Sequence, residues 1–91
     1  MSILDDQIER LYKVKLKLEQ IIQHPNRSLL DVIMIDYIIS LRNSIDEELH
    51  FSNITKSIGK EDIIQEQIEH NAWRLMRSEP EATYFYNLIN R

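Results

Sequence analysis

The residues best suited to binding chemistry lie in the C-terminal part of the chain, where aromatic and basic side chains occur close together. Trp73 and Arg77 are four positions apart, so on a helix the guanidinium can stack on the indole ring. A tryptophan beside an arginine is typical of protein-binding hot spots. The same pair is typical of sites that stack a base and hold a phosphate. The predicted partner or ligand surface comprises Trp73, Arg74, Arg77, Tyr84 and Tyr86.

Trp73 also has a purely structural interpretation. The segment that contains Tyr84, Phe85 and Tyr86 follows a predicted helix break and can fold back over the indole. Three alternatives therefore stay open at this point: a side chain covered by its own chain, a partner surface and a ligand site.

Glu47 and His50 form the pattern Glu-x-x-His, which places a carboxylate and an imidazole on one face of a helix. Di-iron helical bundles use this pattern twice, with further glutamates from two other helices. The other candidate ligands do not repeat the spacing; they are Glu19, Glu66, Glu69 and His70. We interpret these side chains as a solvated face and expect no metal and no cofactor.

The chain carries no motif of a common catalytic site. It has no Gly-rich phosphate loop, no nucleophile elbow and no zinc-protease histidine pair. It has no cysteine, which excludes disulfides, thiolate metal sites and a cysteine nucleophile. We expect a protein that is not an enzyme, and a metal-dependent enzyme using Glu47, His50 and His70 is the weakest hypothesis.

Basic residues near the N-terminus allow two interpretations. Lys15 interrupts an apolar stripe, where it either titrates low and binds an anion, or sets helix register with Asp36 within reach near Tyr37. A second group follows one helix face and either contacts phosphates or an acidic partner, or is solvated with local pairing of Glu9 to Lys13. That group comprises Arg10, Lys13 and Lys17.

The elements that position these residues are predicted to be helices, because one Gly and two Pro leave little material for hairpin turns. The spacing of apolar residues predicts helices over 3–23, 28–51 and 60–77. Residues 52–59 read as a connection, and Ser78-Glu-Pro-Glu81 reads as a capping box that starts a short last helix over 79–90. The fold class is all-α: an antiparallel hairpin plus a third helix and a short C-terminal helix, in one domain over 1–91. A strand over 32–39 is the rival, because β-branched residues are common there.

The segment 29–41 shows two apolar faces when wound as a helix, so it needs cover from two directions. A chain of 91 residues has a thin core, and oligomerisation often supplements it. The sequence therefore predicts a homo-oligomer built partly on Val32, Ile35 and Ile39.

Charge and hydropathy limit the partners. The formal net charge of -4 disfavours general nucleic-acid binding, and no segment is apolar enough over 18 or so residues to span a membrane. The N-terminus lacks the pattern of a secretory signal, so a cytoplasmic protein is expected. The predicted function is a small helical protein-binding module, a regulator, inhibitor or adaptor, that acts as a homo-oligomer. The alternative is an oligomer that sequesters a nucleotide or another anionic small ligand.

Overall fold

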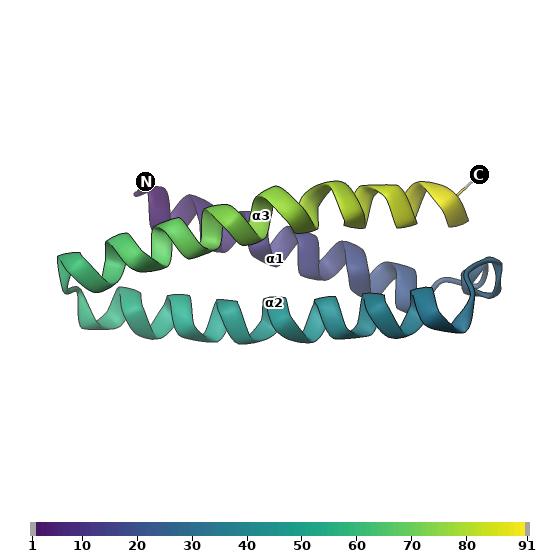
Figure 1. Ribbon diagram of the computed structural model, residues 1–91, viewed down its shortest axis with the longest axis horizontal. Helices are drawn as coiled ribbons and strands as arrows, with labels where there is room; N and C mark the ends of the chain where they lie inside the picture. Colours follow the sequence, from purple (N-terminus) through teal and green to yellow (C-terminus); the bar gives the residue numbers. More distant parts are fainter. Residues whose placement is uncertain (1, 91) are drawn as a thin grey trace.

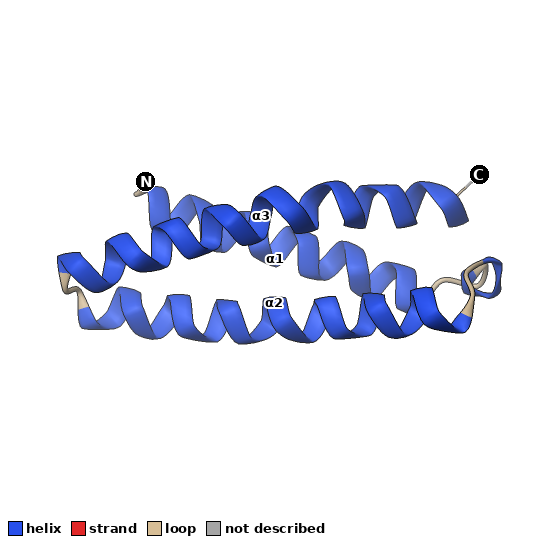
Figure 2. Ribbon diagram, viewed as in Figure 1, coloured by secondary structure: helices blue, strands red, loops and turns tan. Residues whose placement is uncertain are grey.

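Three long helices and one short 3-10 turn make up the described part of the protein. The computed structural model describes residues 2–90, with elements α1 (Ile3–Ile22), η1 (Arg27–Leu29), α2 (Val32–Ile58) and α3 (Glu61–Ile89). The helices run alternately along an elongated bundle of 45 × 20 × 17 Å, with α1 behind α2 and α3 in Figure 1. Figure 2 shows helices and loops but no strand in this range, so the all-α prediction is confirmed and the strand over 32–39 is wrong.

Local capping sets where the helices begin and end. Ser2 Oγ accepts a hydrogen bond from the Asp5 backbone at 3.1 Å and so caps the N-terminus of α1. The helix α2 begins later than predicted, because Asp31 and not Ser28 accepts from the Met34 backbone, at 2.8 Å. It ends at Gly59, whose φ of 71° is the left-handed conformation that glycine adopts without strain.

The core lies along the axis where the three helices meet. Each helix contributes apolar side chains at spacings of three and four residues, which places them on one face. Those exposed by less than 2% are Leu11, Leu18, Ile21, Ile38, Ile45, Ala82 and Ile89. Residues 23–31 connect α1 to α2, and the two helices run antiparallel and contact each other.

The helix α2 runs to Ile58 and does not end at Phe51, so the connection predicted for 52–59 is wrong. Ser52 and Thr55 continue the buried face of the helix after Leu49. Both are polar, and polar residues favour turns in a sequence, but here tertiary packing decides the conformation.

The helix α3 continues through Pro80 to Ile89, so the separate short C-terminal helix is wrong. Proline removes one backbone hydrogen bond and favours a bend, and Figure 1 shows the two halves of α3 inclined to each other. Ser78 does not act as a cap; it is fully buried and donates its hydroxyl to the Arg74 carbonyl at 2.7 Å. Ser78 and Ala82 are both buried on either side of Pro80, and this packing keeps the segment helical.

Ion pairs between α1 and α2 share one register. Lys15 pairs with Asp46 at 2.5 Å, and not with Asp36, because the turn before α2 is longer than predicted. Four residues further along α1, Glu19 lies 3.9 Å from Arg42, which is four residues earlier on α2. The pair Asp5–Lys56 continues the same antiparallel register towards the other end. Lys15 therefore forms an ion pair between the two helices, with a partner other than the predicted Asp36.

The two apolar faces of α2 are covered from within the chain only in part. Both α1 and α3 contact α2, and Ile35 packs against the core. Val32 is 73% exposed, while Ile39 is half-buried. The three residues predicted as an oligomer interface therefore differ in exposure. Ile35 and Ile39 lie on the line that continues to Arg42 and Asp46, which pair with α1, whereas Val32 stays exposed.

Candidate functional site

An exposed apolar stripe follows the outer face of α3. Trp73, Met76 and Tyr84 are 57%, 61% and 59% exposed, and Arg77 and Pro80 are also exposed between them. We call these five residues the Trp73 surface. The Arg77 guanidinium carbon lies 5.9 Å from the centroid of the indole, so the predicted cation–π contact forms. A shallow hollow of about 540 Å³ runs beside Met76, Pro80 and Tyr84.

The alternative in which the last segment covers Trp73 is wrong. It required a helix break near Ser78, after which the chain could reverse. Because α3 is continuous, Tyr84 and Tyr86 extend away from Trp73 along the same helix. The indole is left in solvent, and the partner and ligand hypotheses remain.

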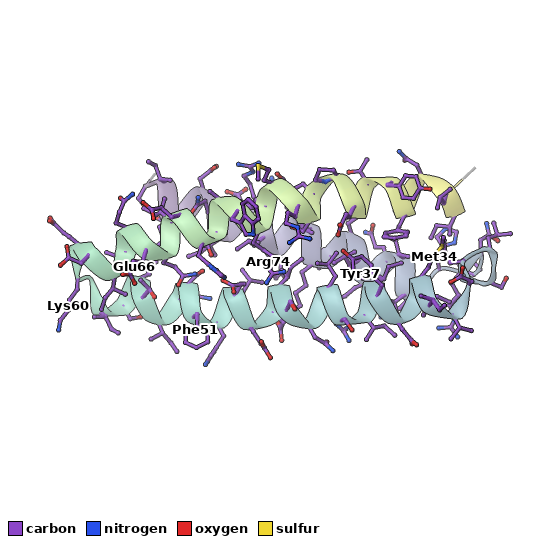
Figure 3. All side chains as sticks on the ribbon, viewed as in Figure 1. Met34, Tyr37, Phe51, Lys60, Glu66 and Arg74 are labelled. Atoms are coloured by element: carbon purple, nitrogen blue, oxygen red, sulfur yellow. The ribbon has the colours of Figure 1, made fainter. Side chains whose placement is uncertain are left out.

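The predicted surface residues do not form one site. Trp73, Arg77 and Tyr84 share the outer face, whereas Tyr86 is half-buried and faces α1, where Lys17 Nζ lies 5.7 Å from its ring centroid. Arg74 turns into the space between α3 and α2, as its label in Figure 3 shows. The sequence gives the spacing of side chains on one helix. Whether each side chain faces solvent or another helix depends on how the other helices pack.

Arg74 lines a hollow of about 220 Å³ between α2 and α3. The α2 wall carries three hydroxyl groups at helical spacing, those of Tyr37, Ser40 and Ser44. Tyr37 donates a hydrogen bond to Glu81 on α3, and this bond, together with burial, raises the pKa of the Tyr37 hydroxyl above its ordinary value. The hollow also contacts Arg77, so it borders the Trp73 surface. Sequence analysis missed the two serines, because they become neighbours of Arg74 only in the bundle.

A buried polar network joins α2 to α3 next to that hollow, on the side towards the N-terminus of α3. Ser52 and Asn71 are fully buried, and the Asn71 amide donates to Ser52 Oγ at 2.9 Å. Gln67 Nε2 donates to Asn71 Oδ1 at 2.8 Å and to Ser52 Oγ at 3.2 Å. Glu48 lies at its edge and pairs with His70 at 2.8 Å. The sequence gives no signal for this network, since its members come from two helices.

The basic stripe of α1 is engaged by the chain itself. Arg10 forms a salt bridge with Glu79 of α3, and this hydrogen-bonded pair raises the pKa of the guanidinium. Lys13 pairs with Glu9 at 3.3 Å, as the local interpretation expected. Lys17 contacts Tyr86, as described above. Arg10 and Lys17 therefore contact α3, whereas Lys13 pairs within α1 and stays largely exposed.

The Glu47–His50 pair lies in an open groove of about 960 Å³ between α1 and α2. Both side chains are exposed, and the groove also contains the aromatic residues Tyr12 and Phe51. His70 belongs to the other side of α2, where it pairs with Glu48. Within residues 2–90, no three His, Asp or Glu side chains lie close enough together to hold a metal ion.

Comparison with protein-family models, with curated proteins and with solved structures finds no match to this chain. None of the helices within residues 2–90 combines the length and the apolar character needed to cross a membrane.

Proposed function

We propose that the protein is a cytoplasmic protein-binding module, a regulator, inhibitor or adaptor, that contacts its partner through the Trp73 surface. The exposed Trp73, with Arg77 held against its ring, is the observation that carries this proposal. Large aromatic residues and arginine supply most of the binding energy at protein interfaces. A rigid helix supports them here, so little conformational entropy is lost when a partner binds.

The shape of the stripe suits a helical partner. Met76, Pro80 and Tyr84 succeed Trp73 at steps of three and four residues, so they follow one line along α3. A partner helix that lies along this line buries the indole together with the Met76 and Tyr84 side chains. Arg77 at the border then favours an acidic residue on the partner.

The experiment starts by identifying the partner. A photoreactive amino acid at position 76, in the full chain expressed in its native cells, captures proteins that touch the Trp73 surface, and the same amino acid at position 51 is the control. Phe51 is 62% exposed and projects from α2 away from α3 in Figure 3. A protein captured at position 76 and not at position 51 is then purified for measurements of affinity.

The Trp73→Ala variant is expected to weaken that affinity by about 30-fold, because a hot-spot residue contributes roughly 2 kcal/mol or more. The Phe51→Ala variant is the matched control and is expected to bind like the parent. The proposal fails if both variants bind equally well, or if Phe51→Ala alone loses affinity. Circular dichroism of both variants establishes that they remain helical.

A further inference from the structure

Arg74 differs from the other arginines of residues 2–90, because its guanidinium has no partner there. Arg10 pairs with Glu79, Arg42 with Glu19, and Arg77 lies against Trp73. Arg27 donates to the Ile22 carbonyl at 3.1 Å. Arg74 forms no such contact within the described range, and its Nε is buried without an acceptor. A partly buried cation without a partner is unfavourable, so this position favours an anion.

The hollow around Arg74 offers several hydrogen-bond donors to such an anion. Ser40 and Ser44 are one helical turn apart on α2 and face the hollow from the side opposite Arg74. Arg77 supplies a second guanidinium. Donors on two sides suit a group with several oxygen atoms, and guanidinium groups recognise phosphate and carboxylate oxygens well.

Size and charge narrow the choice of ligand. The hollow of about 220 Å³ is smaller than the roughly 300–1,000 Å³ of pockets that enclose drug-sized molecules. It therefore accommodates a small group and not a whole cofactor. Glu81 is the one carboxylate among the lining residues, and it already accepts the Tyr37 hydrogen bond. The two arginines leave a positive excess of one charge in the hollow.

We infer that this hollow binds a phosphate group, with Arg74 as its main charged ligand and Ser40 and Ser44 as hydroxyl donors. The phosphate comes either as the free ion or as part of a small ester that also contacts Trp73. At about 100° per residue, Arg77 lies between Arg74 and Trp73 around the helix axis. It lines the hollow and stacks on the indole, so the two sites are continuous. An ester with an aromatic ring can therefore use both.

The test follows the Arg74 Nε–H signal by NMR while inorganic phosphate is added to the full chain. We expect a saturable shift of this signal, which Arg74→Gln removes from the spectrum. In that variant, phosphate affinity measured by calorimetry should fall by about tenfold or more, because a charge-assisted hydrogen bond is lost. Arg42→Gln is the matched control, since Arg42 is a half-buried helical arginine already paired with Glu19. Its phosphate affinity should equal that of the parent.

A second variant keeps the test decisive if Arg74→Gln unfolds. Ser44→Asp places a carboxylate in the hollow, where it can pair with Arg74. It should abolish phosphate binding and raise the melting temperature. A shift that does not saturate, or equal phosphate affinity in the parent, Arg74→Gln and Ser44→Asp, overturns the inference.

Titration with adenosine monophosphate separates the two sources of phosphate. If a ring stacks on Trp73, this ester should bind more tightly than the free ion, and Trp73→Ala should remove the difference while free-phosphate affinity stays unchanged. Equal affinity for the ester and the ion would support the free ion as the ligand. If neither the ester nor the free ion binds, the proposed site is contradicted.

Discussion

Buried polar side chains fix how α2 and α3 align. Asn71 both donates to and accepts from its neighbours, and it is fully buried, so water cannot replace those bonds. A shift of one helix along the other would leave Ser52 and Asn71 without partners. The network therefore favours one register, whereas an apolar contact tolerates several.

Asn71→Ala is expected to lower the free energy of unfolding by about 1–3 kcal/mol, because it removes the buried hydrogen bonds that join Asn71 to Ser52 and Gln67. Urea denaturation followed by circular dichroism measures the change. Asn53→Ala is the control, since Asn53 is exposed on the same helix as Ser52. Equal loss in the two variants would mean that the network contributes nothing specific.

Two aspartates that pair with lysines make stability depend on pH. Hydrogen bonds from Lys56 and Lys15 lower the pKa of Asp5 and Asp46, respectively, below the ordinary value of 3.8. A carboxyl with a lowered folded-state pKa stabilises the fold above the unfolded value, and this contribution is lost as the pH falls through the folded value. Stability should therefore decline in acid.

The Asp5→Asn/Asp46→Asn variant should be less stable than the parent at about pH 6, and the difference should shrink towards about pH 2. Thermal melts in buffers across this range measure it. Asp36→Asn is the control, because Asp36 is exposed on α2 and forms no salt bridge within residues 2–90. A constant difference at all pH values would contradict the assignment to these carboxylates.

At the scale of single residues, contacts within one helix could be predicted from the sequence, whereas contacts between helices were missed. Trp73 and Arg77 are on one helix, and their spacing alone predicts that they meet. The serines that face Arg74 come from another helix, so their position depends on a register that no spacing on α3 contains. The correct partner of Lys15 was missed for the same reason.

The helices themselves were predicted where apolar periodicity and capping residues agreed. α1 has both, and its predicted range differs little from Ile3–Ile22. The predicted ends of the other two helices were wrong where the local conformational preference of the residues and tertiary packing disagree. Residues 52–59 were predicted to be a connection and Pro80 to lie at the start of a new helix, but both segments bury side chains against the bundle.

Pro80 should weaken the helix that contains it. Pro80→Ala restores a backbone N–H that can reach the Met76 carbonyl, and removes the steric conflict of the ring. The variant is expected to be more stable by roughly 1–3 kcal/mol in urea denaturation. Thr83→Ala is the control, because it changes an exposed position on the same helix without adding a hydrogen bond. A loss of stability in Pro80→Ala would show that the bend itself improves packing.

At the scale of the whole molecule, apolar surface is exposed to solvent at the end of the bundle where η1 meets α2. Leu29, Val32 and Ile33 are 69%, 73% and 80% exposed. We propose that copies of the chain associate through this end, which includes Val32 of the interface predicted from the sequence. Ile35 is less suitable as a contact between copies, because it already packs against the core.

Sedimentation velocity tests this proposal. The parent should sediment as an oligomer, and Val32→Glu/Ile33→Glu should sediment as a helical monomer, because charge at a contact between copies opposes association. Phe51→Glu is the control and should keep the oligomer. Ile35→Glu should lower the melting temperature instead, since it buries a charge. A parent that is monomeric at all concentrations would refute the proposal.

Because α1 and α3 run in the same direction, residues 2 and 90 lie at opposite poles of the bundle (Figure 1). Tension applied between these poles pulls α1 and α3 past each other along their length. Such shear must break all the contacts between the two helices at the same time. The helices cannot separate one turn after another. The protein should therefore resist mechanical stretching along its long axis more strongly than force applied across it.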